Sequence, residues 1–144
     1  MVRKSEIDEY DEKILNILLE NSRMSFTEIG KILNLSEGSI RKRIKKLINL
    51  NIIKKFTVII DYKKIGKIES FTGINVSPES MLKVIEELKK IENIKRIYLT
   101  SGDHNLIVDI VVDSFNELEK IHKKIEEIKG VLNIYPSTIV EIIK

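Results

Sequence analysis

The chain has 144 residues, of which 42% are hydrophobic and 33% charged, with a formal net charge of +3 and no cysteine. This length allows one domain or two small ones with a packed core, and it excludes a large multidomain enzyme. Without cysteine there is no disulfide framework, thiolate zinc site or cysteine nucleophile. No run approaches the roughly 20 apolar residues that cross a bilayer. Residues 1–10 are unlike a secretory signal, so we expect a cytoplasmic protein.

The first part of the sequence predicts three helices in close succession. Apolar residues recur at spacings of three and four over residues 8–21, and acidic residues in the first turn suit the helix dipole. A second helix over 25–33 begins with the Ser-x-x-Glu spacing of a capping box. After a two-residue turn, Ser36 caps a third helix over 37–49.

Basic residues are concentrated in one part of the chain. Residues 36–67 hold 10 basic and 2 acidic side chains, a net charge of +8, whereas residues 1–35 carry −2 and residues 68–144 carry −3. This density favours a polyanionic partner, and it favours nucleic acid over a membrane because no wide apolar face with Trp or Phe accompanies it. A solvated charged face is the alternative.

A helix, a short turn and a basic helix follow the plan of a helix-turn-helix DNA-binding domain. The face of the third helix opposite its apolar stripe is basic, and its N-terminal end is the part that a recognition helix presents to base edges. Arg43 lies on the flank, where it contacts DNA in one interpretation and clamps a neighbouring carboxylate in the other. The predicted DNA-binding residues are Ser36, Glu37, Gly38, Ser39, Arg41, Lys42, Arg43, Lys45 and Lys46, with the lysines at phosphates.

The rest of the chain alternates strands and helices. Residues 53–60 are rich in β-branched side chains and predict a strand, so 53–67 is interpreted as a strand connector between domains 1–52 and 68–144. The later elements are strands at 70–77, 95–100, 106–112 and 132–143 and helices at 79–91 and 114–129. This order, βαββαβ, predicts an α+β fold whose second domain is ferredoxin-like, an antiparallel sheet with two helices on one face. Surplus apolar strand residues predict a dimer formed sheet to sheet.

Several local strings resemble those of one family, the Lrp/AsnC transcription regulators of bacteria and archaea, over essentially the whole chain. The strings are Ile7-Asp8, Asp11, Ile14-Leu15, Asn21-Ser22-Arg23, Leu35-Ser36, Arg43-Ile44, Leu47, Ile52-Ile53, Ile65-Gly66, Gly102 and Gly130-Val131. The resemblance implies a winged-type helix-turn-helix domain and a RAM/ACT-like domain for effector binding and oligomerisation. It further implies a homodimer assembling to a tetramer or octamer, a pseudo-palindromic site in double-stranded DNA, and an amino-acid effector.

The segment 101–105 has a composition that any hairpin turn could show. The resemblance implies that it borders an effector pocket, with Asp103 or Asn105 meeting a ligand ammonium. The implied effector-binding residues are Ser101, Gly102, Asp103, His104, Asn105 and Pro136. Asn105 stands where the family commonly has Asp, and Pro136 where Thr is frequent. His122, on a helix among lysines, is expected to be solvated.

One further departure concerns Asn51, which stands where the family usually has Gly. Asparagine tolerates the left-handed conformation that a helix end often needs, so we expect the departure to cost little.

No phosphate-binding glycine loop or nucleophile elbow is present in the sequence, so we expect neither an enzyme nor a metal or other cofactor. Two alternatives remain: a DNA-independent sensor or architectural protein of the same fold, and a relative of the tetrapyrrole-precursor decarboxylases that resemble this family.

Overall fold

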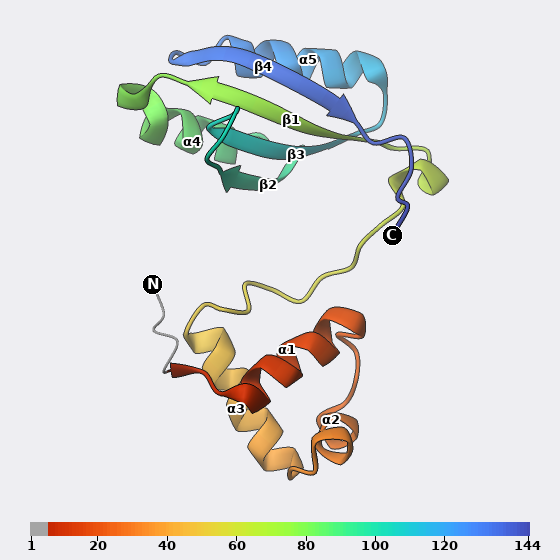
Figure 1. The fold of residues 1–144 in the computed structure, drawn as a ribbon. Helices are drawn as coiled ribbons and strands as arrows, with labels where there is room; N and C mark the ends of the chain where they lie inside the picture. The colour runs from red at the N-terminus through yellow and green to blue at the C-terminus, as the bar shows by residue number, and fades with distance from the viewer. Residues whose placement is uncertain (1–5) are drawn as a thin grey trace. The chain divides into compact units, whose positions relative to one another are not determined.

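The chain folds into two compact units, residues 1–59 and residues 60–144, in a computed structural model that describes residues 6–144 (Figure 1). The first five residues of the predicted domain 1–52 lie outside the described residues. Each unit has its own hydrophobic core. No helix within residues 6–144 has the length and apolar character needed to cross a membrane.

The N-terminal unit contains three helices, α1 (Glu9–Glu20), α2 (Phe26–Leu33) and α3 (Glu37–Asn49). The predicted cap at Ser36 and the capping box that opens α2 are both confirmed. A second capping box, between Asp8 and Asp11, begins α1. The core contains side chains from all three helices: Ile14, Ile29, Ile40, Ile44 and Leu47.

The turn between α2 and α3 is tight because the backbone of Leu35 occupies the space that a side chain at position 30 would need. A Cβ atom at Gly30 would lie 2.5 Å from the carbonyl oxygen of Leu35, so only glycine fits. Asn34 ends α2 in the left-handed conformation with φ 55°. Asn51, after α3, has φ 58°, which confirms the left-handed conformation expected there.

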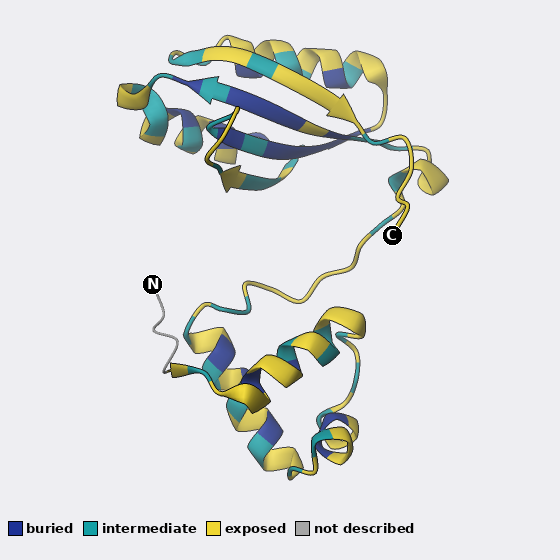
Figure 2. Ribbon diagram, in the orientation of Figure 1, coloured by how far each residue is buried: buried dark blue, intermediate teal, exposed yellow. Residues whose placement is uncertain are grey.

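The predicted strand over 53–60 is wrong for this chain. Residues 54–60 form neither helix nor strand, and Val58 and Ile59 are 66% and 85% exposed (Figure 2). β-Branched residues favour an extended backbone, but a strand needs a neighbour to complete its hydrogen-bond ladder, and this segment has none among residues 6–144. A 3₁₀ helix, η2 (Tyr62–Ile65), follows it.

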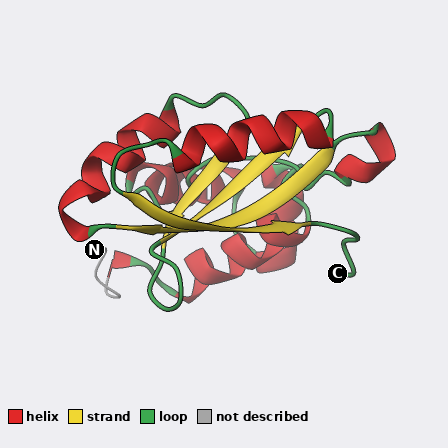
Figure 3. Cartoon of the chain, turned by 90° about the horizontal axis from the view of Figure 1, so that it is seen from above, coloured by secondary structure: helices red, strands yellow, loops and turns green. Residues whose placement is uncertain are grey.

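The C-terminal unit has the predicted βαββαβ order. Its elements are β1 (Ile68–Val76), η3 (Pro78–Ser80), α4 (Met81–Lys89), β2 (Ile94–Leu99), β3 (Leu106–Val112), α5 (Phe115–Glu126) and β4 (Val131–Thr138). The strands form one antiparallel sheet, yellow in Figure 3, and their order is β2-β3-β1-β4, as labelled in Figure 1. The last strand stops at Thr138 rather than at residue 143, because Thr138 pairs with Ser70 and little of β1 remains beyond that pair.

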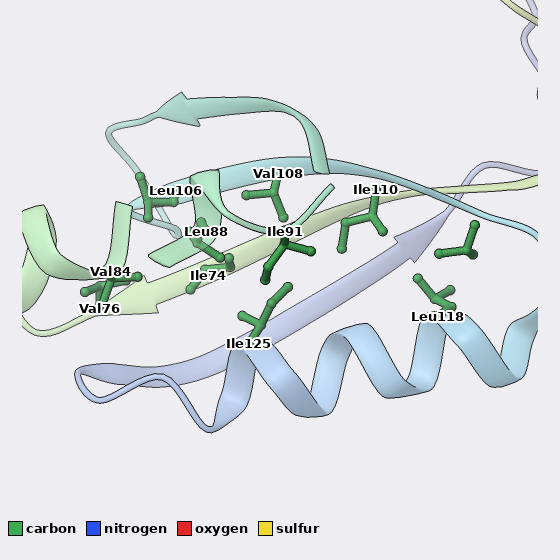
Figure 4. Close-up of a cluster of buried hydrophobic side chains, with 11 residues drawn as sticks. Ile74, Val76, Val84, Leu88, Ile91, Leu106, Val108, Ile110, Leu118 and Ile125 are labelled. Carbon is green, nitrogen blue, oxygen red and sulfur yellow. The ribbon is translucent and has the colours of Figure 1, made fainter. Parts of the chain in front are cut away.

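Both helices of this unit pack on the same face of the sheet. Alternate residues of β1 and β3, such as Ile74 and Val108, are buried against Leu88 of α4 and Ile125 of α5 (Figure 4). Side chains alternate between the faces of a sheet, so residues such as Phe71 point to the opposite face. We call this second face, which neither helix covers, the open face.

Candidate functional site

The outward face of α3 is open and basic. With Ile40 at 0° and 100° per residue, Gly38, Lys42 and Lys45 lie on the side opposite the buried stripe, and all three are exposed. Within residues 6–144, neither lysine has a hydrogen bond or ion pair with another side chain. A Cβ atom at Gly38 would meet nothing within 4 Å, so the fold itself does not require glycine there. This face is therefore free to meet a ligand.

The first turn of α3 presents further polar groups. Ser36 and Glu37 are exposed, and the Ser36 hydroxyl accepts a hydrogen bond of 3.1 Å from the backbone N–H of Ser39. Arg41 pairs with Glu37 one turn earlier, and its guanidinium lies 5.3 Å from the ring centre of Phe26 in α2. Arg41 is thus held at the edge of the outward face.

Two other cations of α3 are turned toward α1. The Arg43 guanidinium lies 2.7 Å from Asp8 and 3.0 Å from Asp11, and the Lys46 ammonium pairs with Asp11. Asp11 is completely buried, so these cations compensate a charge that would otherwise be costly. For Arg43 the carboxylate clamp is the interpretation that the structure bears out. Lys46, predicted at a phosphate, is drawn into the same network.

The electrostatics of this network follow from its contacts. The hydrogen bond from Arg43, with that from the backbone N–H of Asp11, lowers the pKa of Asp8 to about 2. Burial raises the pKa of Asp11, but hydrogen bonds from Lys46, the Asp8 backbone and Arg43 outweigh it and leave that pKa below its usual value. Both carboxylates are therefore ionised at neutral pH and fix α3 against α1.

The hairpin predicted to border an effector pocket divides into two parts. Ser101, Gly102 and Asp103 are exposed, and Gly102 has φ 123°. His104 instead folds back over the open face, where its ring lies 4.6 Å from the ring of Tyr135. No local sequence pattern indicates this placement.

Two contacts hold the hairpin residues after the turn. A Cβ atom at Gly73 would lie 2.4 Å from the His104 ring, so this glycine makes room for the imidazole. Asn105 fastens the hairpin to β1: its side-chain Oδ1 accepts a 2.7 Å hydrogen bond from the Val76 N–H, and its own N–H donates to Ile74. Oδ1 of Asn105 is thus engaged within the fold.

Pro136 lies apart from the hairpin. It follows Tyr135 on β4 and so faces the helix side of the sheet, where it lines a cavity of about 370 Å³ with His122. Within one chain, the predicted effector residues therefore occupy two different faces of the sheet.

The expectation that His122 is solvated holds only in part, because this residue is half-buried and contacts the sheet. Its Nε2 is 2.8 Å from the hydroxyl of buried Thr72, which lies 3.0 Å from the hydroxyl of Ser70. Burial lowers the pKa of His122, although the nearby Glu126 acts in the opposite direction. Lysines close in sequence suggested a wet surface, but the partner that decides the environment is 50 residues away.

Comparison with known proteins gives consistent matches for both units. A family model of the AsnC-type helix-turn-helix domain matches residues 7–48, and one of the Lrp/AsnC ligand binding domain matches residues 69–144. The HTH-type transcriptional regulator LrpA of Pyrococcus abyssi is 40% identical over 140 residues, covering 96% of this chain and 99% of that protein.

Solved structures agree with the fold. The crystal structure of PH0061 superposes with a TM-score of 0.87 at 34% identity, covering 99% of this chain and 97% of that chain. The transcriptional regulator NMB0573 of Neisseria meningitidis, solved as a complex with L-Met, has a TM-score of 0.76 at 18% identity, covering 96% and 92%. The second likeness is one of fold alone.

Proposed function

Because the chain belongs to the Lrp/AsnC family and is a DNA-binding transcription regulator with a small-molecule-binding domain, we propose which of its surfaces perform these tasks. The outward face of α3 lies in the major groove, with Lys42 and Lys45 at phosphates and the N-terminal turn, from Ser36 to Arg41, at base edges. A regulator of this kind works beside the chromosome, so its site of action is the cytoplasm.

One observation carries the DNA-binding proposal: the division of the cations of α3. Arg43 and Lys46 are committed to the carboxylates of α1, whereas Lys42 and Lys45 have no such partner within residues 6–144. Placing two unpaired ammonium groups on one side of a helix costs stability through repulsion unless a polyanion receives them. The paired cations instead set the orientation of the helix.

A dimer formed through the open face accounts for the uncovered side of the sheet. Phe71, Tyr98 and Tyr135 are large, partly exposed rings on this face, one from each of three strands. Apolar patches of this kind mark interaction surfaces, and a two-fold axis lets the same patch serve both copies. The two recognition helices of such a dimer meet a pseudo-palindromic site with half-sites one or more helical turns apart. Dimers of this kind can assemble further into tetramers or octamers.

The effector is an amino acid or a related metabolite. The ligand-binding domain matches residues 69–144, and a regulator with the same fold was solved with L-Met. Within a single chain the hairpin and Pro136 are on different faces, so the proposed site is completed by a neighbouring subunit. Asp103 offers an exposed carboxylate to the ligand ammonium, whereas the side-chain oxygen of Asn105 is already bonded to the Val76 N–H.

The test is selection of bound sequences from a random pool of double-stranded DNA, with and without a panel of amino acids. A two-fold motif with helical-turn spacing supports the regulator as proposed, and a motif or affinity that shifts with one amino acid supports the effector. A lack of enrichment contradicts sequence-specific binding and favours an architectural protein or a sensor that acts without DNA. Turnover of a tetrapyrrole precursor would favour the decarboxylase alternative. We consider this alternative weaker, because similar proteins such as LrpA and LysM are transcriptional regulators.

A further inference from the structure

Two carboxylates share one end of the open face. Asp109 on β3 pairs in register with Phe71 on β1, and Glu69 on β1 pairs with Val111, so the two acidic residues are diagonal neighbours on the same face. Side chains of diagonal neighbours lie within reach of each other, so the two carboxyl groups can share one proton. Asp109 is 4% exposed, and its Oδ1 has no hydrogen-bond partner within the described residues.

The surrounding charges do not neutralise this pair. Arg96 on β2 stands in register with Asp109, yet within residues 6–144 its guanidinium forms no ion pair with either carboxylate. The ammonium of Lys67 is held by Asp113. The remaining charged or titratable groups beside Glu69 come from η2 and the C-terminal segment: Asp61, Tyr62, Lys63 and Glu141.

A close pair of carboxylates, of which Asp109 is buried and Glu69 half-buried, favours sharing one proton, because two ionised carboxylates that are partly removed from water repel each other. Burial, together with proton sharing with Asp109 and the charge of that residue, raises the pKa of Glu69 to about 7, although Arg96 acts in the opposite direction. The pair therefore changes its charge near neutral pH, where an ordinary glutamate is fully ionised.

The charge of the open face points to a second copy of this chain as its partner. Three charged side chains lie on this face of β1, β2 and β3: Glu69, Asp109 and Arg96. The imidazole of His104 covers Gly73, four residues along β1 from Glu69. With one shared proton their charges sum to zero, and without it they sum to −1. Two identical faces with the proton in place can meet without net repulsion, whereas two deprotonated faces each bring a negative charge into a site that loses its water.

We propose that the Glu69–Asp109 pair couples self-association through the open face to proton uptake, so that dimers form more tightly as the pH falls through neutrality. The inference rests on the proposed dimer. Covering the face with a second copy removes the remaining water from Glu69 and further disfavours its charged form, so each chain binds more protons in the dimer than in the monomer. By linkage, the dissociation constant must fall as protons are added.

The experiment is sedimentation equilibrium of the full chain at constant ionic strength. For the wild type we expect the dimer dissociation constant to fall about tenfold or more from about pH 8 to about pH 6. Glu69→Gln, whose amide can donate to Asp109 as the protonated acid does, should dimerise tightly and independently of pH. Asp109→Asn should weaken the dependence, because burial of Glu69 remains, and the matched exposed variant Glu92→Gln should keep it in full.

The outcomes separate this inference from the dimer on which it rests. A dimer whose affinity does not change with pH, or a dependence that Glu69→Gln retains, would overturn the proton coupling and leave the dimer intact. Tighter association at high pH would also overturn the proton coupling, because it would mean that positive charges of the second copy, and not a proton, neutralise the Glu69–Asp109 pair. If Tyr98→Asp, checked for folding by circular dichroism, dimerises like the wild type, the open face is not the interface and both proposals fail.

Discussion

The guanidinium of Arg43, in the middle of the recognition helix, lies 2.7 Å from the carboxylate of Asp8, the residue that caps α1. One acidic side chain thus has two tasks: it begins one helix and fixes the rotation of another. The orientation of the proposed DNA-reading face therefore depends on residues that do not themselves lie on it.

The titration of Asp8 tests this contact. Because Arg43 stabilises its ionised form, we expect Asp8 to titrate at about 2 in the wild type and closer to the ordinary 3.8 in Arg43→Met, as followed by carboxyl NMR shifts. The pKa is lowered on folding, so this contact stabilises the protein above about pH 4 and is lost as the pH falls toward 2. Asp8→Asn keeps a good cap and should remove this pH dependence. An Asp8 pKa unaffected by Arg43→Met would contradict the clamp.

Lys45 and Lys46 are neighbours in sequence, and the ion pair of Lys46 with Asp11 leads us to assign them different roles. Lys45→Ala should weaken DNA binding on all sequences, because it removes a phosphate contact. The slope of log affinity against log salt concentration should therefore become shallower by about 1. Lys46→Met leaves the buried carboxylate of Asp11 with one cation fewer, so it should lower the free energy of unfolding by about 1–3 kcal/mol and change the salt slope less. Binding at several salt concentrations and urea denaturation measure the two effects. Lys83→Ala, in the other unit, is the control, and equal salt slopes for Lys45→Ala and the wild type would contradict the assignment.

Gly73 is predicted to be required by His104 and not by its own backbone. In Gly73→Ala the new methyl group would meet the imidazole, so the stack on Tyr135 should open and unfolding should become easier by about 1–3 kcal/mol. The double variant Gly73→Ala/His104→Ala removes both partners of the clash and should recover much of this loss, a coupling that a double-mutant cycle measures. Purely additive effects would show that the ring does not rest on this glycine. Gly38→Ala, which meets open space, should leave stability within the ordinary range for surface changes.

The contact between His122 and Thr72 predicts a pH effect in the C-terminal unit. Burial lowers the pKa of His122, so its contribution to stability is present above about 6.5 and declines as the pH falls below that value. The raised pKa of Glu69 has the opposite effect, since the contribution of Glu69 to the free energy of unfolding declines as the pH rises from about 4.5 toward 7. The test is therefore the difference in unfolding free energy between the wild type and His122→Gln, which should shift in favour of the variant on acidification. A difference that is constant with pH would mean that His122 is not buried in its neutral form.

The sequence predicted those elements whose signals are local. The helix over 37–49 and the strand over 106–112 have the expected bounds, because a cap and an apolar stripe mark the first and a continuous apolar run marks the second. Gly30 was not singled out, since its requirement comes from the carbonyl of Leu35 across the turn.

Partners distant in sequence were the part that could not be predicted. The sequence pattern relates the acidic residues in the first turn of α1 to the helix dipole. In the structure Asp11 is instead the buried partner of Arg43 and Lys46, which lie 32 and 35 positions further along the chain. Helical periodicity assigns a residue to a face but does not say what packs against that face. The failed strand over 53–60 has the same cause: β propensity describes a side chain that suits a sheet and does not supply the neighbouring strand.

The segment 54–60 also bears on how such regulators arise. It has no helix or strand hydrogen bonds, and each unit keeps a complete core on its own side of it. A genetic crossover within these codons would leave both hydrophobic cores intact. DNA-reading and metabolite-sensing halves can therefore be exchanged between genes, so that a new promoter and an old signal are joined in a single recombination event.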